Sequence, residues 1–78
     1  MNIDAKKLLN GLGGSKNVKT IEACITRLRV EVAAPDAVDE DLLRSAGAYG
    51  VVTQDGVIQV VVGPAADELQ GAIEKLCS

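Results

Sequence analysis

The alternation of apolar and polar residues through residues 17–32 changes phase once, and this change limits how the segment can fold. Apolar side chains stand at odd positions up to residue 25 and at even positions from residue 28: Ile21, Ala23, Ile25, Leu28, Val30 and Val32. Successive side chains of a β-strand point to opposite faces of the sheet, so a one-residue change of phase exchanges the two faces. The pattern therefore predicts two strands joined by a tight turn or bulge at residues 24–27.

A second pair of strands is predicted by residues 50–62, which read GVVTQDGVIQVVV. Two runs rich in β-branched residues flank Asp55 and Gly56. An Asp-Gly pair adopts positive φ readily, and between two such runs it favours a two-residue hairpin.

Three segments around these strands, residues 3–14, 35–47 and 63–78, read as short amphipathic helices. The first two each contain an aspartate that can cap the first turn and a glycine that can end the helix, and the third begins near a proline. These signals are Asp4, Gly13, Gly14, Asp39, Gly47 and Pro64. The apolar faces recur at helical spacing and are predicted to be buried: Leu8, Leu9, Leu12, Leu42, Leu43, Ala46, Leu69, Ile73 and Leu76.

The predicted element order is therefore α-β-β-α-β-β-α in a chain of 78 residues. A chain of this length is expected to form one domain, residues 1–78. Alternating strands imply a sheet with one buried face, and amphipathic helices are expected to cover it. The fold class predicted is an α+β sandwich.

The composition argues against several classes of function. Tyr49 is the only aromatic residue and the net charge is −3. Nucleic-acid binding is not expected, because such proteins stack bases on aromatic side chains and attract phosphates with positive charge. The sequence has no histidine, so an imidazole base, a phosphohistidine and a histidine metal ligand are all impossible. We predict no metal and no cofactor.

The two cysteines and the short apolar runs narrow the setting. Cys24 and Cys77 have no disulfide framework or secretory leader around them, so reduced thiols in a cytosolic protein are expected. The longest apolar run has three or four residues, as at residues 60–62, whereas a membrane-spanning helix needs about 20.

The predicted turn brings Cys24 close to two cations. Arg27 and Arg29 are two positions apart, so their side chains point to the same side of a strand. In the simplest interpretation the cysteine only packs and the arginines lie on a solvated face. The change of phase favours another interpretation, because it places Cys24 at the end of a strand beside a loop, where functional groups tend to lie.

The groups around this turn suit a phosphoryl group. The N–H groups of Ile25, Thr26 and Arg27 can form a concave nest of donors for an anion. The guanidinium groups of Arg27 and Arg29 stabilise a thiolate, and their planar forks match phosphate oxygens. The residues therefore predict a site that holds a phosphoryl group on the sulfur of Cys24.

Other cysteine chemistries fit less well. The C-x5-R pattern of tyrosine phosphatases would need arginine where Val30 stands, and a C-x-x-C redox motif would need cysteine where Arg27 stands. A cysteine protease needs a histidine base, and the sequence has none.

The segment ACITRLRV, residues 23–30, is similar to the signature around the phosphorylated cysteine of enzyme IIB domains in the bacterial sugar phosphotransferase system, glucose and N-acetylglucosamine branch. SAGAYGVV at residues 45–52 and GVIQVVVG at residues 56–63 also resemble segments of that family. The resemblance covers about residues 4–76. It implies a four-stranded antiparallel sheet covered on one face by three helices.

The resemblance also implies a phosphoryl relay. A IIA domain carries phosphate on a histidine, Cys24 takes it, and a sugar bound by the membrane-embedded IIC transporter receives it. The domain would then work in the cytoplasm, at the inner face of the bacterial membrane through IIC. Arg27 and Arg29 correspond to two functional arginines, expected to matter most in transfer to the sugar, while Thr26 and the neighbouring amides, that of Ile25 included, would steady the phosphate.

Two residues depart from the family pattern, and other hypotheses remain open. Ser45 stands where the family commonly has leucine, and Cys77 matches no family site and is interpreted as a frayed terminal thiol. One alternative is a non-catalytic module that binds a small ligand or a partner helix, with Cys24 packed. Another is a redox pair of Cys24 and Cys77. The strand order and the sugar, glucose or N-acetylglucosamine, are left open.

Overall fold

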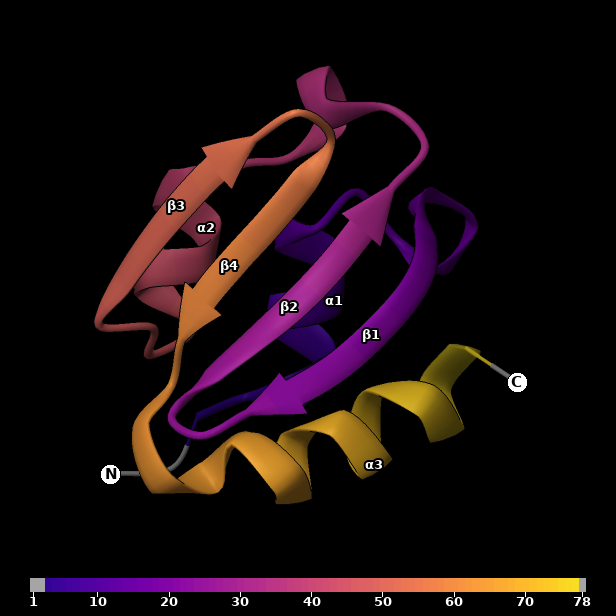
Figure 1. Ribbon diagram of the computed structural model, residues 1–78. Coiled ribbons are helices and arrows are strands. Elements are labelled where there is room, and N and C mark those ends of the chain that lie inside the picture. The colour runs from indigo at the N-terminus through magenta and orange to yellow at the C-terminus, as the bar shows by residue number, and fades with distance from the viewer. Residues whose placement is uncertain (1–2, 78) are drawn as a thin grey trace.

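The computed structural model describes residues 3–77, and within them the helices and strands follow the predicted order (Figure 1). They are α1 (Ala5–Gly11), β1 (Val18–Cys24), β2 (Arg27–Val32), α2 (Glu40–Ser45), β3 (Gly50–Gln54), β4 (Val57–Val61) and α3 (Ala66–Cys77). Short 3₁₀ turns precede β1, α2 and α3 at Ser15–Asn17, Pro35–Ala37 and Gly63–Ala65.

The four strands form one antiparallel sheet in the order β1-β2-β4-β3. Each predicted hairpin pairs its own strands, and the two hairpins meet where β2 pairs with β4. In Figure 1, α1 and α2 lie behind the sheet and α3 runs along the edge strand β1. The other face of the sheet is open. The predicted α+β sandwich, a four-stranded antiparallel sheet with three helices over one face, is confirmed.

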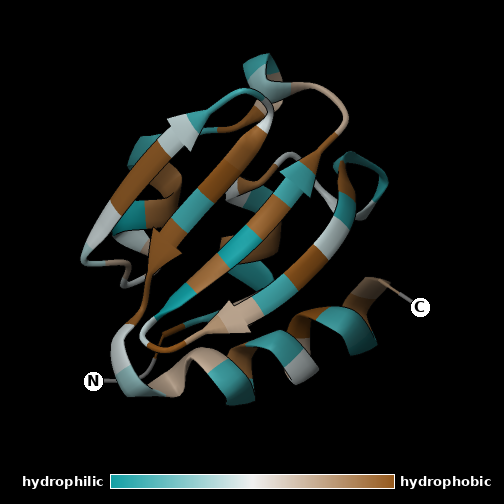
Figure 2. Ribbon diagram, viewed as in Figure 1, coloured by the Kyte–Doolittle hydropathy of each residue, from teal (hydrophilic) through white to brown (hydrophobic). Residues whose placement is uncertain are grey.

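Alternate side chains of the two central strands build the core. Those that are fully buried beneath the helices are Leu28, Val30, Ile58 and Val60, and the helices add Leu8, Leu12, Leu43 and Ile73. Burying each such side chain contributes roughly 1.5–3 kcal/mol. Figure 2 shows the resulting alternation of hydrophobic and hydrophilic residues along β2 and β4. The same alternation directs Arg27 and Arg29 to the open face, where both are exposed.

The predicted caps and the second hairpin turn are also confirmed. The carboxylates of Asp4 and Asp39 each accept a hydrogen bond from an amide in the first turn of the following helix, at 3.2 and 3.1 Å. Asp55 has φ 50° and Gly56 has φ 79°. A type I′ turn requires positive φ at both central residues, and its twist matches that of the strands it joins.

The predicted buried face of α3 was wrong at one residue. Leu69 and Ile73 are buried, but Leu76 is 46% exposed. Helical spacing places it on the same face as the other two, but the last turn of α3 extends beyond the layers that would cover it (Figure 1). In α2 and its C-cap, Leu43 and Ala46 are buried as predicted and Leu42 only partly.

Candidate functional site at the β1–β2 turn

The turn between β1 and β2 has an unusual backbone. β1 ends at Cys24 and β2 begins at Arg27, so Ile25 and Thr26 alone connect them, as the change of phase predicted. Ile25 has φ 59°, and Thr26 is not among the residues with positive φ. Positive φ at the first central residue only is the pattern of a type II′ turn, where glycine is usual. A β-branched residue there is strained by about 1–3 kcal/mol.

The end of β4 holds this turn in place. The carbonyl oxygen of Thr26 accepts hydrogen bonds from the N–H of Val62 at 3.0 Å and from the N–H of Gly63 at 2.8 Å. Both donors belong to the connection from β4 to α3. The turn is therefore fixed to the body of the protein by backbone groups on its β4 side.

The five residues predicted to form the site lie together. A depression of about 350 Å³ on the surface is lined by Cys24, Ile25, Thr26, Arg27, Arg29 and Gln59. Cys24 is a free, exposed thiol, and Ile25 is 89% exposed. The interpretation of Cys24 as a packed cysteine is therefore wrong, because β1 ends at this residue and no element covers its side chain.

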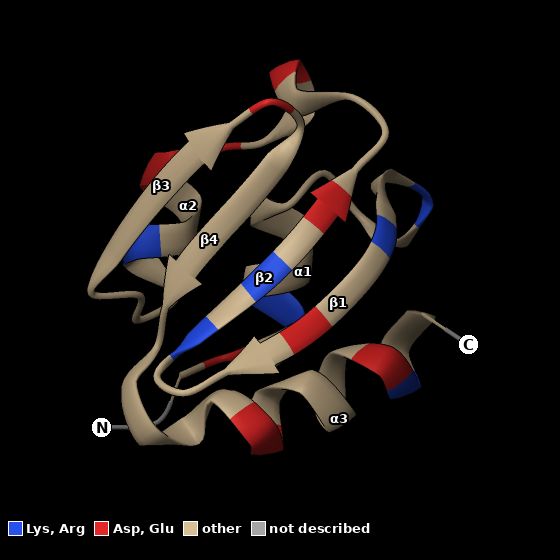
Figure 3. Ribbon diagram, in the orientation of Figure 1, with Lys and Arg blue, Asp and Glu red and all other residues tan. Residues whose placement is uncertain are grey.

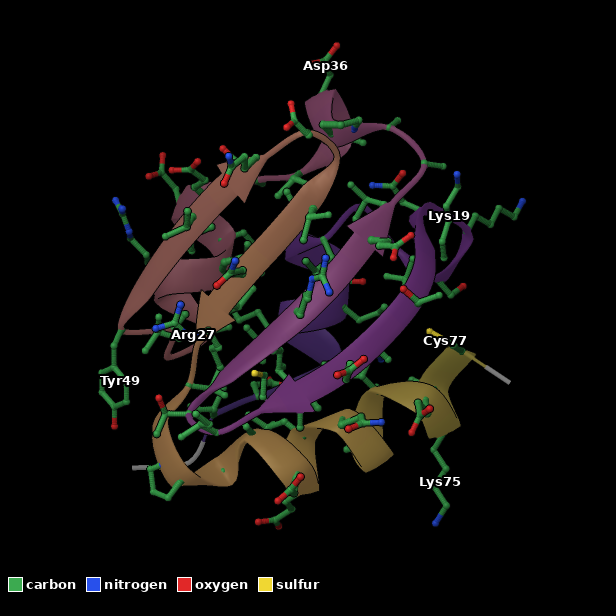
Figure 4. The ribbon with its side chains drawn as sticks, viewed as in Figure 1. Lys19, Arg27, Asp36, Tyr49, Lys75 and Cys77 are labelled. Carbon is green, nitrogen blue, oxygen red and sulfur yellow. The ribbon has the colours of Figure 1, made fainter. Side chains whose placement is uncertain are left out.

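The two arginines differ in how they are held. A guanidinium Nη of Arg27 donates a hydrogen bond of 2.8 Å to the side-chain oxygen of Gln59, so Arg27 reaches across the end of β4 (Figure 4). Arg29 stands opposite Gln59 in the β2–β4 register and opposite Glu22 in the β1–β2 register. Its guanidinium makes no hydrogen bond or ion pair within residues 3–77.

Gln59 is a member of the site that the sequence analysis missed. It is the single polar residue of β4, and nothing near it in the sequence connects it with Cys24. The connection comes only from the pairing of β2 with β4, which places residues 29 and 59 side by side. The signal that could have found it is the outward phase of Gln59 in β4, which puts it on the same face as the arginines.

Two of the three predicted amide donors are available. The N–H groups of Ile25 and Thr26 have no hydrogen-bond partner in the described part of the chain. Arg27 pairs with Cys24 on one side and with Val61 on the other, so its amide belongs to the sheet. The predicted nest is therefore smaller than expected, with two donors in place of three.

The second cysteine lies away from this site. Gln70 of α3 accepts a hydrogen bond from the N–H of Ala23, and Cys77 comes seven residues later in the same helix. Seven residues advance a helix by about 10 Å, whereas the Cα atoms of a disulfide lie within about 7 Å. The hypothesis of a redox pair of Cys24 and Cys77 is therefore wrong. Cys77 is exposed, as predicted, but it belongs to the end of α3.

Two further features bear on the chemistry. Residues 3–77 contain no group of three or more histidine, cysteine, aspartate or glutamate side chains placed to hold a metal ion. Across the same residues, none of the helices has the length and the apolar character needed to span a membrane. The groups that the turn brings together are a thiol, two guanidinium groups, an amide side chain and two backbone N–H groups.

These observations define a class of small α+β proteins that present an exposed thiol beside two arginines at the end of a sheet. Residues 6–39 match the family model for the EIIB component of the phosphotransferase system. The N-acetylglucosamine-specific EIIB component of Streptomyces coelicolor is 50% identical over 72 residues, which cover 92% of this chain and 94% of that protein. The chain belongs to the EIIB family of the phosphotransferase system, and it is a phosphoryl-transfer component of that system.

Two further relatives agree with this assignment. The N-acetylglucosamine-specific EIICB component of Bacillus subtilis is 49% identical over 72 residues, which cover 86% of this chain but 16% of that longer protein. The solved structure of one domain of a phosphotransferase-system IIabc component from Clostridium difficile superposes with a TM-score of 0.76 at 25% identity, covering 91% of this chain and 75% of that one. The expected resemblance to the glucose and N-acetylglucosamine branch is confirmed.

Proposed function

We propose that Cys24 carries the phosphoryl group, taking it from a phosphohistidine of a IIA domain and passing it to N-acetylglucosamine bound by a membrane IIC transporter. The observation that carries this proposal is the exposed thiol, which shares one depression with Arg27 and Arg29. The choice of N-acetylglucosamine over glucose rests on the names of the two relatives, both specific for that sugar. The EIICB name of one relative also supports IIC as the partner.

In the first step, the deprotonated sulfur of Cys24 attacks the phosphorus atom of the donor. A sulfur–phosphorus bond forms while the nitrogen–phosphorus bond breaks, and the histidine nitrogen keeps the electron pair. The thiol proton has left to solvent. Because Cys24 is exposed at the end of β1, a donor can approach its sulfur from the solvent side.

In the second step, a hydroxyl oxygen of the sugar attacks the same phosphorus atom. An oxygen–phosphorus bond forms, the sulfur–phosphorus bond breaks, the thiolate is regenerated, and the hydroxyl proton passes to a base on the transporter side or to solvent. Phosphoryl transfer depends mostly on positioning and on stabilising charge on the phosphoryl oxygens. Arg27, Arg29 and the free N–H groups of Ile25 and Thr26 supply that stabilisation.

The two steps assign different tasks to the two arginines. Arg27 is held by Gln59 before any phosphate arrives, so its fork is already oriented toward the depression. Arg29 has no partner within residues 3–77 and is free to turn toward the phosphoryl group as charge develops. Through IIC, the protein would work in the cytoplasm, at the inner face of the bacterial membrane.

The test is labelling of Cys24 by phosphorylated IIA. The parent protein should take up about one phosphoryl group per chain, and the bond should be sensitive to iodine, as expected for phosphocysteine. Cys24→Ser should abolish labelling, because a serine hydroxyl is a far weaker nucleophile than a thiolate. Cys77→Ser, which removes the other exposed thiol, should label as the parent does. Retained labelling of Cys24→Ser would contradict the proposal.

A further inference from the structure

A second depression lies on the other side of the Cys24 turn. Its volume is about 440 Å³. Its lining includes the exposed ring of Tyr49, two residues that directly precede α3, and three residues of α3. These are Tyr49, Pro64, Ala65, Glu68, Leu69 and Ala72. Tyr49 is 76% exposed. Among the described residues that line it, Glu68 alone carries a charge.

This depression is joined to the Cys24 site by the connection from β4 to α3. Val62, which contributes to its lining, and Gly63 donate their N–H groups to the carbonyl of Thr26. The ring of Tyr49 covers Gly63, since a Cβ atom on that glycine would lie 3.1 Å from the ring. A partner seated in the depression would therefore touch the segment that holds the Cys24 turn in place.

The two sides of the turn have opposite charge. Arg27 and Arg29 line the depression on the open face, whereas Glu68, in the first turn of α3, lines the second depression. Figure 3 shows the basic residues on β2 and the acidic start of α3 at the same end of the molecule. The turn that carries Cys24 is thus flanked by two arginines and, through Val62, by a mostly apolar depression that contains one carboxylate.

We propose that the second depression is the docking site for a cytoplasmic loop of the IIC transporter, one that carries lysine or arginine next to an apolar side chain. The inference rests on the proposed function, in which one sulfur meets two partners in turn. Cytoplasmic loops of membrane proteins are rich in lysine and arginine. Such loops would be repelled by Arg27 and Arg29, and attracted by Glu68. An exposed tyrosine at the rim is typical of an interface residue that becomes covered.

The experiment separates docking to IIC from transfer out of IIA. Glu68→Lys reverses the charge of the depression, and Tyr49→Ser removes its aromatic wall without changing charge. Two quantities are measured for each variant. The first is the rate at which phosphorylated IIA labels Cys24. The second is the protein concentration that gives half-maximal phosphorylation of N-acetylglucosamine by vesicles containing IIC. Asp36→Lys is the matched control, because Asp36 is exposed at the opposite end of the molecule from Tyr49 (Figure 4).

Both variants should label at the parental rate. Glu68→Lys should raise the half-maximal concentration by about tenfold at low salt, with a smaller effect at high salt where charges are screened. Tyr49→Ser should raise it at any salt concentration, and Asp36→Lys should not change it. Slower labelling with unchanged transfer to the sugar would assign the depression to the donor and overturn the inference, as would equal effects of Glu68→Lys and Asp36→Lys. Failure of the parent protein to be labelled would contradict the proposed function, and this inference with it.

Discussion

Among single residues, Ile25 occupies the least favourable backbone conformation of the site. It is a β-branched residue at φ 59°, and 89% of its side chain is exposed, so burial does not offset a strain of about 1–3 kcal/mol. The two hydrogen bonds to the carbonyl of Thr26 restrain the turn instead. Glycine would relieve the strain but would also free the turn to adopt other conformations. Isoleucine at this position therefore leaves fewer backbone conformations open to the turn than glycine would.

A prediction at this scale concerns Gln59, which holds the guanidinium of Arg27 by a hydrogen bond of 2.8 Å. Gln59→Leu should slow transfer from Cys24 to the sugar by about tenfold, because a misplaced positioning group loses much of the benefit of pre-orientation. Gln59→Glu should slow it further, since a carboxylate beside Arg27 competes with the phosphoryl group. Single-turnover measurements starting from phosphorylated protein test both variants.

The control for Gln59 is Gln54→Leu, an exposed glutamine of β3. It should transfer phosphate at the parental rate, and its free energy of unfolding should change by no more than about 0.5 kcal/mol. A parental rate in Gln59→Leu would show that Arg27 needs no anchor.

Some residues of the candidate site could be predicted from the sequence, and others could not. Cys24, Arg27 and Arg29 were found because the change of phase is visible within fifteen residues of sequence, and a turn places its own neighbours together. Gln59 was not found because it joins the site through the pairing of β2 with β4. Pairing between strands of different hairpins depends on the packing of the whole sheet and leaves no local pattern.

Among the elements, α3 completes the edge of the sheet next to the site. β1 is an edge strand, and edge strands present unpaired backbone groups. The side-chain oxygen of Gln70 accepts the N–H of Ala23 at 2.8 Å. This bond fixes α3 to the strand at the residue directly before Cys24.

Gln70→Met should therefore lower the free energy of unfolding by about 1–2 kcal/mol, because it leaves a partly buried N–H without an acceptor. Gln70→Glu keeps an acceptor oxygen at the same position and should retain most of the stability, less a few tenths of a kcal/mol from repulsion with Glu74 one turn away. Urea unfolding of the two variants measures the difference. Equal stabilities would mean that the bond contributes nothing.

The order of the elements was predictable, because each carries local signals: caps at Asp4 and Asp39, a turn at residues 55–56, and alternation along the strands. The strand order β1-β2-β4-β3 was not, since nothing in either hairpin says which strand of the other will pair with it. Leu76 was misassigned for a related reason. Its spacing in α3 is helical, but whether a neighbour covers it depends on where the sheet ends.

For the whole molecule, the thin core limits how large a loss of stability the folded state can tolerate. A chain of 78 residues has a total stability of roughly 4–12 kcal/mol at about 0.05–0.15 kcal/mol per residue. Leu28 lies between Arg27 and Arg29 in the sequence of β2, but its side chain points to the other face of the sheet and is fully buried. Leu28→Ala should cost about 2–5 kcal/mol and should lower phosphoryl transfer through loss of folded protein.

Urea unfolding followed by fluorescence of a dye or by circular dichroism gives this loss. Val52→Ala, at a side chain that is 51% exposed on β3, is the control and should change the stability by no more than about 0.5 kcal/mol. A loss below about 1 kcal/mol in Leu28→Ala would mean that the core repacks around the smaller side chain.

The thiol of Cys24 is exposed and lines a surface depression at the end of the open face of the sheet. Under the proposed function, discrimination between sugars would belong to the transporter that receives the phosphoryl group. If docking is to a transporter loop as proposed, one carrier would serve transporters for different sugars wherever their docking loops are alike.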